Sequence, residues 1–263
     1  MLYGAMNFPV VPVLQELKVF SEMGFDYLEL AMDPPRAHHS AIEKQAERIL
    51  EALDTADMGL VCHLPTFVST ADLTESLRQA SLQEMLDSLE TAARLRPMKI
   101  VVHPSYFSGL GVHVPDEVKA YALESLRALV EKGEALGTTL CLENMFPRSR
   151  FLVEPDDFED IFRRFPSLKL TLDTGHAKLE APGSRRILEF VERFPDRLEH
   201  VHASDNLGTG DHHLPIGTGV IDFPAIVRAL KSVGYEKTVT LEIFSKDRDY
   251  LRISRDKLAA MLA

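Results

Sequence analysis

Histidines and carboxylates end a series of short apolar runs in this 263-residue sequence. Six consecutive runs, separated by longer amphipathic stretches, each finish on such a residue: His63, His103, Glu143, Asp173, His202 and Glu242. Imidazole and carboxylate groups without thiolates suit Zn²⁺, Mn²⁺, Mg²⁺ or Co²⁺. The pattern therefore indicates a divalent-metal site, if the fold brings the ends of these runs together.

Three further residues of the same chemical types follow shortly after two of the runs, namely His176, Asp211 and His213. A single histidine or aspartate at a strand end is usually a helix cap or a satisfied core group, but capping does not explain six in succession. Burying so many ionisable groups together is costly unless a metal ion or mutual pairing neutralises them. Because the set exceeds the coordination of one ion, we expect either one ion with substrate-binding groups or two to three ions.

The elements that must position these residues are alternating strands and helices. The apolar runs read as strands buried on both faces, as in a parallel sheet: Leu2–Met6, Tyr27–Leu30, Gly59–His63, Lys99–His103, Thr139–Glu143, Lys169–Asp173, Leu198–His202 and Thr238–Glu242. The stretches between them have helical periodicity: Pro12–Met23, Ala41–Ala56, Leu73–Leu95, Pro115–Leu136, Pro155–Phe165, Ser184–Phe194, Phe223–Val233 and Tyr250–Leu262.

Eight such units predict an α/β fold, a (β/α)₈ TIM barrel that forms a single domain over residues 1–263. A doubly wound sheet is the alternative, but the sequence has neither G-x-G-x-x-G nor a Walker A motif. The C-terminal ends of barrel strands share one face, where barrel enzymes carry their active sites. The metal-ligand types are therefore expected to converge there.

Composition limits the function classes. Lysine plus arginine number 29 and aspartate plus glutamate 40, which gives a net charge of −11. This charge disfavours a nucleic-acid partner. No basic, apolar leader is visible at the N-terminus and no apolar run approaches the ~18 residues of a membrane helix, so we expect a cytoplasmic protein without a membrane partner. Cys62 and Cys141 lie inside apolar runs, which predicts buried, reduced thiols.

Several sequence motifs resemble the xylose isomerase-like barrel superfamily, which includes a sugar-phosphate isomerase/epimerase group and an endonuclease IV group. The motifs are VCHLP, VVHPS, CLENM, TLDTGH, HVHASDN, DHHLPIGTGVIDF and LEIF, and they span nearly the whole chain. Resemblance to the first group implies a metal-dependent sugar isomerase or epimerase. Glu143, Asp173, His202 and Glu242 would then hold one divalent ion, and Glu143 and Glu242 would be the acid/base pair around a metal-stabilised cis-enediolate. His176 would contact a substrate hydroxyl.

Resemblance to the endonuclease IV group implies an alternative, a zinc-dependent phosphodiesterase that cuts DNA at abasic sites with three ions. The three matching ligand sets are all present: His63, His103 and Glu143; Glu143, Asp173, His202 and Glu242; His176, Asp211 and His213. The acidic charge and the segments that follow Glu143, His103 and His202 favour the sugar chemistry, in which His63 and His103 line the pocket. A third interpretation is a metal-binding barrel that has lost its activity or has a regulatory role.

Basic residues on the loops after the strands, namely Arg148, Lys178 and Lys246, suit contacts with an acidic or phosphorylated sugar. The alternative is that they are solvated charges of the loops. Aromatic residues on the same loops fit either a sugar ring or a subunit contact, so a homo-oligomer stays open. Glu29 is expected either to face the pocket or to form a salt bridge in the barrel mouth. His200 shares the face of His202 and is read as a core residue below it.

Overall fold

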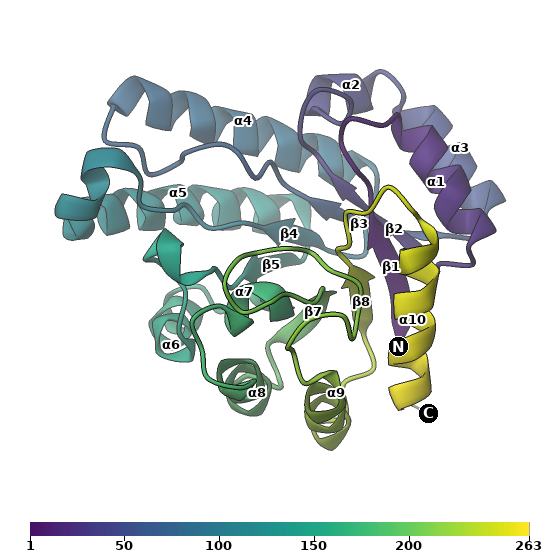
Figure 1. Cartoon of the computed structure of the whole chain (residues 1–263). Helices are drawn as coiled ribbons and strands as arrows, with labels where there is room; N and C mark the ends of the chain where they lie inside the picture. The colour runs from purple at the N-terminus through teal and green to yellow at the C-terminus, as the bar shows by residue number, and fades with distance from the viewer. Residues whose placement is uncertain (263) are drawn as a thin grey trace.

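Eight parallel strands form a closed barrel in the computed structural model, which describes residues 1–262 (Figure 1). Each strand pairs with the next along the chain, and β1 pairs with β8 to close the ring. The predicted TIM barrel is thus confirmed. The strands are β1 (Leu2–Met6), β2 (Tyr27–Ala31), β3 (Gly59–His63), β4 (Ile100–Val102), β5 (Leu140–Glu143), β6 (Lys169–Asp173), β7 (Leu198–Ala203) and β8 (Thr238–Leu241).

The strands bury both of their faces because alternate side chains enter two different environments. Leu28 and Leu60 belong to the large core between the barrel and its helices. Tyr27, Val61 and Val101 form a separate small cluster. Glu29 lies two residues after Tyr27 on β2, so its carboxylate points to the same face of the strand as the ring of Tyr27.

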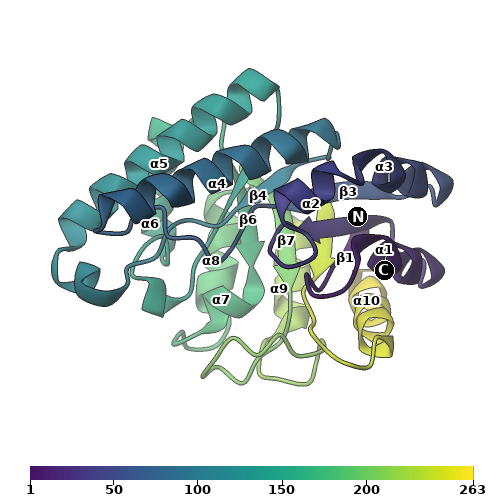
Figure 2. The ribbon, with the colours of Figure 1, turned by 90° about the horizontal axis from the view of Figure 1, so that it is seen from above.

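Helices surround the barrel, and α4 and α5 run side by side along one flank in both views of the ribbon (Figures 1 and 2). The α-helices are α1 (Val13–Glu22), α2 (His39–Glu43), α3 (Ala46–Thr55), α4 (Glu75–Arg94), α5 (Pro115–Leu136), α6 (Pro155–Arg164), α7 (Thr174–Lys178), α8 (Arg185–Arg193), α9 (Phe223–Ser232) and α10 (Asp249–Leu262), with short 3₁₀ turns at Gly109–His113 and Pro147–Ser149. Helix α5 ends at Leu136, and the next residue, Gly137, adopts a left-handed φ of 68° that a side chain would disfavour.

The helix predicted over 41–56 is wrong as a single element, because the chain forms α2 and α3 with a break at Gln45. No glycine or proline marks this break. Tertiary packing decides it instead: α2 lies against α4, whereas α3 lies against α1. The short helix α7 was not predicted. It begins directly after β6, where the Asp173 side chain accepts a hydrogen bond from the His176 amide.

Two predicted strands are shorter than expected at their C-terminal ends. The ladder of β4 stops at Val102 and that of β8 at Leu241, so His103 and Glu242 lie just beyond their strands. Because both residues lie outside the ladder, the alternating orientation of strand side chains does not apply to them, and both lie at the barrel mouth.

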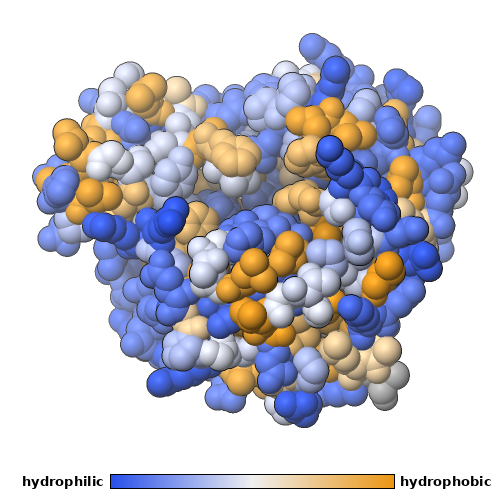
Figure 3. All heavy atoms as spheres, viewed as in Figure 1, coloured by the Kyte–Doolittle hydropathy of each residue, from blue (hydrophilic) through white to orange (hydrophobic). Residues whose placement is uncertain are grey.

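The face of the molecule drawn in Figure 3 carries exposed apolar side chains in several small groups among charged ones, and it is hollowed near its middle. The most exposed large apolar residues in the described part of the chain are Phe67 and Leu110, on the loops after β3 and β4. Among the described residues, no helix is both long and apolar enough to span a membrane.

Candidate metal centre

Four residues predicted as metal ligands converge where strands β5 to β8 end. Glu143 and Asp173 are the last residues of β5 and β6, His202 is in β7, and Glu242 follows β8. The register of the β6–β7 ladder sets Asp173 directly beside His202. One donor atom from each of the four residues lies within 4.8 Å of the others.

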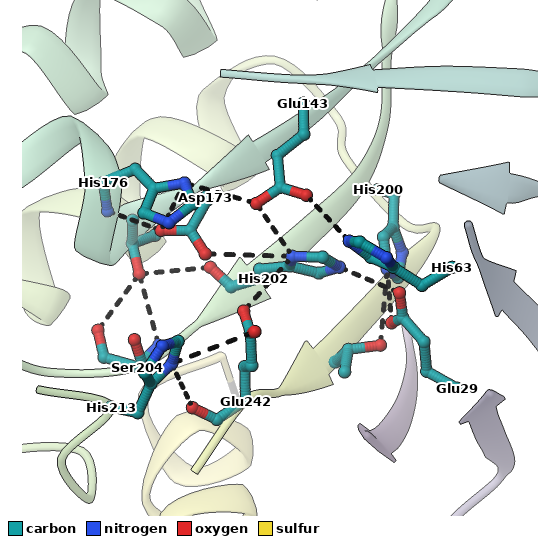
Figure 4. Close-up of polar contacts among 12 residues, drawn as sticks. Glu29, His63, Glu143, Asp173, His176, His200, His202, Ser204, His213 and Glu242 are labelled. Carbon is teal, nitrogen blue, oxygen red and sulfur yellow. Dashed lines mark hydrogen bonds and ion pairs between the residues drawn. The ribbon is translucent and has the colours of Figure 1, made fainter. Parts of the chain in front are cut away.

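The imidazole of His202 lies at the middle of this group. Its Nδ1 atom is 3.4 Å from Glu143 Oε1, 3.4 Å from Glu242 Oε2 and 3.8 Å from Asp173 Oδ2. Figure 4 shows Glu143 and Glu242 approaching the ring from opposite sides. Three carboxylates and one imidazole nitrogen therefore face a common point.

Three of these facing atoms are buried and have no hydrogen-bond partner, namely Asp173 Oδ2, His202 Nδ1 and Glu242 Oε2. Buried polar atoms in folded proteins are nearly always paired, so an orphaned group of this kind needs an explanation. A divalent cation supplies one, because carboxylate oxygens and an imidazole nitrogen are the donors that Zn²⁺ and Mn²⁺ accept. The donor set thus fits the expected ion.

The local field pushes the pKa values of the two glutamates apart. Burial would raise the pKa of Glu143, but the attraction of His202 and hydrogen bonds from His202 and His63 hold it well below its usual range. Burial raises the pKa of Glu242 to about 7, although His213 and His202 counteract part of the shift. Burial also raises the pKa of Asp173.

The histidines around the group also differ in charge. Burial would lower the pKa of His202, but Glu29 and Glu143 take it well above its usual range. A hydrogen bond to Glu143 (Nε2–Oε2, 3.3 Å) outweighs burial at His63 and raises its pKa to about 9. At His103 burial prevails and lowers the pKa to about 3. His103 is therefore a neutral imidazole at neutral pH.

The remaining predicted ligands extend the same site. His176 is 3.3 Å from Glu143 (Nδ1–Oε1) and 3.4 Å from Asp211 (Nε2–Oδ2). Asp211 in turn lies 2.9 Å from His213 (Oδ2–Nε2), whose Nδ1 donates to the Glu242 carbonyl at 3.1 Å. Despite burial, bonds from His176 and His213 hold the pKa of Asp211 well below its usual range. All nine predicted histidines and carboxylates therefore belong to one connected cluster.

The three basic residues predicted as substrate contacts lie in different surroundings. Arg148 lines a cavity of about 230 Å³ that Asp211 also lines, so this cavity adjoins the cluster. Lys178 is buried and donates to the Ala181 carbonyl at 2.9 Å. Lys246 is exposed on the loop after β8. Their roles in substrate binding stay predictions.

Two residues that shape the site were missed in the sequence. Asn144 accepts from the Asp173 amide at 2.7 Å and donates to the Asp173 carbonyl at 3.1 Å, which fixes one metal-ligand candidate against the next strand. Asp205 is fully buried and binds the backbone of the long loop that carries Asp211 and His213. The only signal for Asp205 was its place after the seventh strand, before a glycine-rich loop.

A separate group of His38, His39 and Glu84 also brings metal-ligand types together, between α2 and α4. The two oxygens of Glu84 lie 3.0 Å from His38 Nε2 and 3.5 Å from His39 Nε2. These donors and acceptors satisfy one another and are half-buried, so nothing in this group calls for an ion.

The closed barrel and the donor set at its strand ends define a class of (β/α)₈ proteins suited to bind a divalent cation. A profile of the xylose isomerase-like TIM barrel matches residues 17–261, and the chain belongs to this family. The predicted superfamily is confirmed.

Individual relatives cover almost the whole chain. An uncharacterized protein of Methanocaldococcus jannaschii is 28% identical over 278 residues, which cover 98% of this chain and 92% of the relative. L-ribulose 3-epimerase of Mesorhizobium japonicum is 28% identical over 249 residues, or 86% of this chain and 73% of the enzyme. The crystal structure of a D-tagatose 3-epimerase-like protein matches with a TM-score of 0.89 at 27% identity, covering 100% of this chain and 97% of the other.

Proposed function

We propose that this chain is a divalent-metal-dependent sugar epimerase or isomerase that acts on a ketose or a ketose phosphate. One observation carries the proposal: Glu143 and Glu242 reach the orphaned His202 Nδ1 from opposite sides, at 3.4 Å each (Figure 4). Two carboxylates so placed can flank one carbon of a bound sugar. The names of the L-ribulose and D-tagatose relatives support inversion at the third carbon, next to the keto group.

The cation would be held by Glu143, Asp173, His202 and Glu242. When bound, it would polarise the keto oxygen and the neighbouring hydroxyl oxygen and stabilise the negative charge that develops on them. The metal is one of Zn²⁺, Mn²⁺, Co²⁺ or Mg²⁺, with one ion per chain.

Epimerisation then needs two proton transfers by the protein. One glutamate removes the proton from the carbon beside the carbonyl and becomes a carboxylic acid. The other glutamate delivers a proton to the opposite face of the resulting planar carbon and becomes a carboxylate, so the net change is inversion at that carbon. Glu143 and Glu242 exchange these roles in the reverse reaction. Acid/base groups placed in this way contribute ~10²–10⁴-fold to the rate.

The other residues of the cluster would bind the sugar hydroxyls. His176 lies between Glu143 and Asp211 and is nine-tenths or more buried, so its position is fixed. His63 faces the other oxygen of Glu143, Oε2, whereas His103 lies 3.9 Å from Oε1, the oxygen that His176 also faces. Arg148, in the adjoining cavity with Asp211, would hold the distal end of the substrate.

The test is a panel of ketoses and ketose phosphates incubated in deuterated buffer with protein loaded with each of the four metals. We expect one solvent deuterium at the carbon beside the carbonyl of the epimerised product, and no product after the metal is removed with a chelator. Metal-loaded protein that exchanges no proton on any member of the panel would contradict the proposal.

A second candidate function is a phosphodiesterase, favoured by the assembly of His63, His103, His176, Asp211 and His213 around the central group. These residues would hold a second and a third zinc ion, and ions a few ångströms apart suit displacement at phosphorus. Elemental analysis separates the two functions: about one ion per chain supports the epimerase, whereas about three zinc ions with cleavage of an abasic-site duplex support the phosphodiesterase.

A further inference from the structure

A fully buried carboxylate inside the barrel lies directly beneath the candidate metal centre. Glu29 is in the middle of β2, and two strands, β8 and β1, separate it from the β7 strand of His202. Its Oε1 is 3.0 Å from His202 Nε2 and its Oε2 is 3.0 Å from His200 Nε2 (Figure 4). Neither acid/base chemistry nor metal ligation, as proposed above, uses Glu29.

The contact with Glu29 decides which nitrogen of His202 faces the metal ligands. An ionised carboxylate can only accept hydrogen bonds, so His202 Nε2 must carry the proton that it donates. A histidine that binds a metal ion must be a neutral imidazole with one N–H, so the lone pair available to the ion is on Nδ1. That atom faces Glu143, Asp173 and Glu242 and has no hydrogen-bond partner.

Glu29 is itself held in place by a second histidine. His200 donates from Nε2 to Glu29, and its Nδ1 lies 2.7 Å from the Thr238 hydroxyl. Because the Glu29 carboxylate only accepts, the Nε2 atom of His200 carries the proton, and its Nδ1 atom accepts a hydrogen bond from Thr238. Thr238, His200, Glu29 and His202 thus form one hydrogen-bonded chain of buried groups, whose end is the metal-facing nitrogen.

We infer that Glu29 is a positioning residue for the metal centre, which fixes the tautomer and the ring orientation of His202 so that Nδ1 can bind a divalent cation. Carboxylates that accept from a ligating histidine act in this way, and their loss typically weakens metal binding about 10–100-fold. The inference rests on the metal-binding part of the proposed function and not on its sugar chemistry.

The variant Glu29→Gln tests it with little change in shape. A glutamine offers one oxygen and one NH₂ group, so it can accept from only one of the two imidazoles. Its NH₂ group faces the N–H of the other ring, or that ring must change tautomer and place its proton on Nδ1. We expect the Kd for Co²⁺ or Zn²⁺ to rise about 10–100-fold, measured by calorimetry on protein stripped with a chelator and without any sugar.

The matched control is Glu16→Gln. Glu16 is also buried and accepts a 2.7 Å hydrogen bond from Arg248, but it lies on α1, away from the metal ligands. This variant loses a buried charge pair, so its thermal stability falls, whereas its Co²⁺ affinity stays that of the wild type. The visible spectrum of bound Co²⁺ supplies a second readout, because it changes with the coordination of the ion. It should change in Glu29→Gln and not in Glu16→Gln.

If Glu29→Gln does not fold, Glu29→Asp decides the question, because the shorter carboxylate keeps the charge but cannot reach both imidazoles. Wild-type Co²⁺ affinity and spectrum in a folded Glu29 variant would overturn the inference. Wild-type protein that binds the ion but turns over no sugar would overturn the epimerase proposal and leave the inference standing. Wild-type protein that binds no divalent ion would overturn both.

Discussion

The Asp205 side chain binds the backbone of the loop between β7 and α9, so its replacement by asparagine should make that loop more mobile. The side chain accepts hydrogen bonds from four backbone N–H groups: Oδ1 from Asn206 (2.9 Å) and Ile221 (3.1 Å), and Oδ2 from Gly217 and Gly219 (2.9 Å each). An asparagine keeps one oxygen and replaces the other with an NH₂ group. Two N–H groups then lose their acceptor and face another donor, either the buried amides of Asn206 and Ile221 or the less buried amides of Gly217 and Gly219.

The cost follows from this count. A buried donor left without an acceptor costs about 1–3 kcal/mol, so the loss of both buried amides, Asn206 and Ile221, costs about 2–6 kcal/mol. The two bonds that remain also weaken, because bonds to a charged acceptor are roughly twice as strong as neutral ones. At about 2–4 °C per kcal/mol for a protein of this size, even the lower limit reduces Tm by about 4–8 °C.

Hydrogen exchange and thermal unfolding measure the two consequences. We expect the amides of Gly217, Gly219 and Ile221 to lose protection in Asp205→Asn, and Tm to fall as above. Asp222→Asn is the control, since Asp222 accepts from the Ala225 amide as the N-cap of α9 and asparagine caps a helix about as well as aspartate. Unchanged protection of the loop amides, with a Tm no lower than that of the control, would show that Asp205 does not hold this loop.

Three other predictions concern the site and its surroundings. Metal affinity should fall as pH drops through about 7, because the ligand must be deprotonated and burial raises the pKa of Glu242 to about 7; calorimetry between pH 6 and pH 8 checks this, and a flat profile argues against Glu242 as a ligand. Gly219→Ala should disorder the loop, since a Cβ there would lie 2.1 Å from a backbone oxygen, whereas Gly210→Ala meets only a histidine side chain at 3.2 Å; equal exchange protection in the two variants would contradict this. Cys62 and Cys141 should resist a thiol reagent until urea unfolds the chain, because both are buried and burial raises their pKa values; rapid labelling of native protein would count against it.

The barrel and its metal-ligand types could be predicted from the sequence because both repeat with the strands. Each strand is a short apolar run, and each of six runs finishes on a histidine or a carboxylate. Once the strands are parallel, their ends must meet on one face. The convergence of Glu143, Asp173, His202 and Glu242 follows from topology alone, without any knowledge of side-chain contacts.

Contacts across the barrel could not be predicted in the same way. Glu29 was expected to face the pocket or to form a salt bridge in the barrel mouth, and the structure shows the second. Its partners, His200 and His202, could not be predicted, because they depend on the tilt of strands that are not neighbours. Asp205 binds backbone amides up to sixteen residues away, and these bonds depend on the course of the loop, which no periodic sequence pattern predicts. The break at Gln45 is set by which helices pack together.

In the proposed function, Glu143 and Glu242 move protons on a sugar held beside one divalent ion. The most direct measurement is the rate of solvent-deuterium incorporation into the ketose that wild-type protein epimerises, compared among wild type, Glu143→Gln and Glu242→Gln at saturating metal, with the exposed Glu22→Gln as control. We expect a loss of about 10²–10⁴-fold in each of the two site variants and wild-type exchange in the control. Wild-type exchange in folded, metal-loaded Glu143→Gln and Glu242→Gln would contradict it.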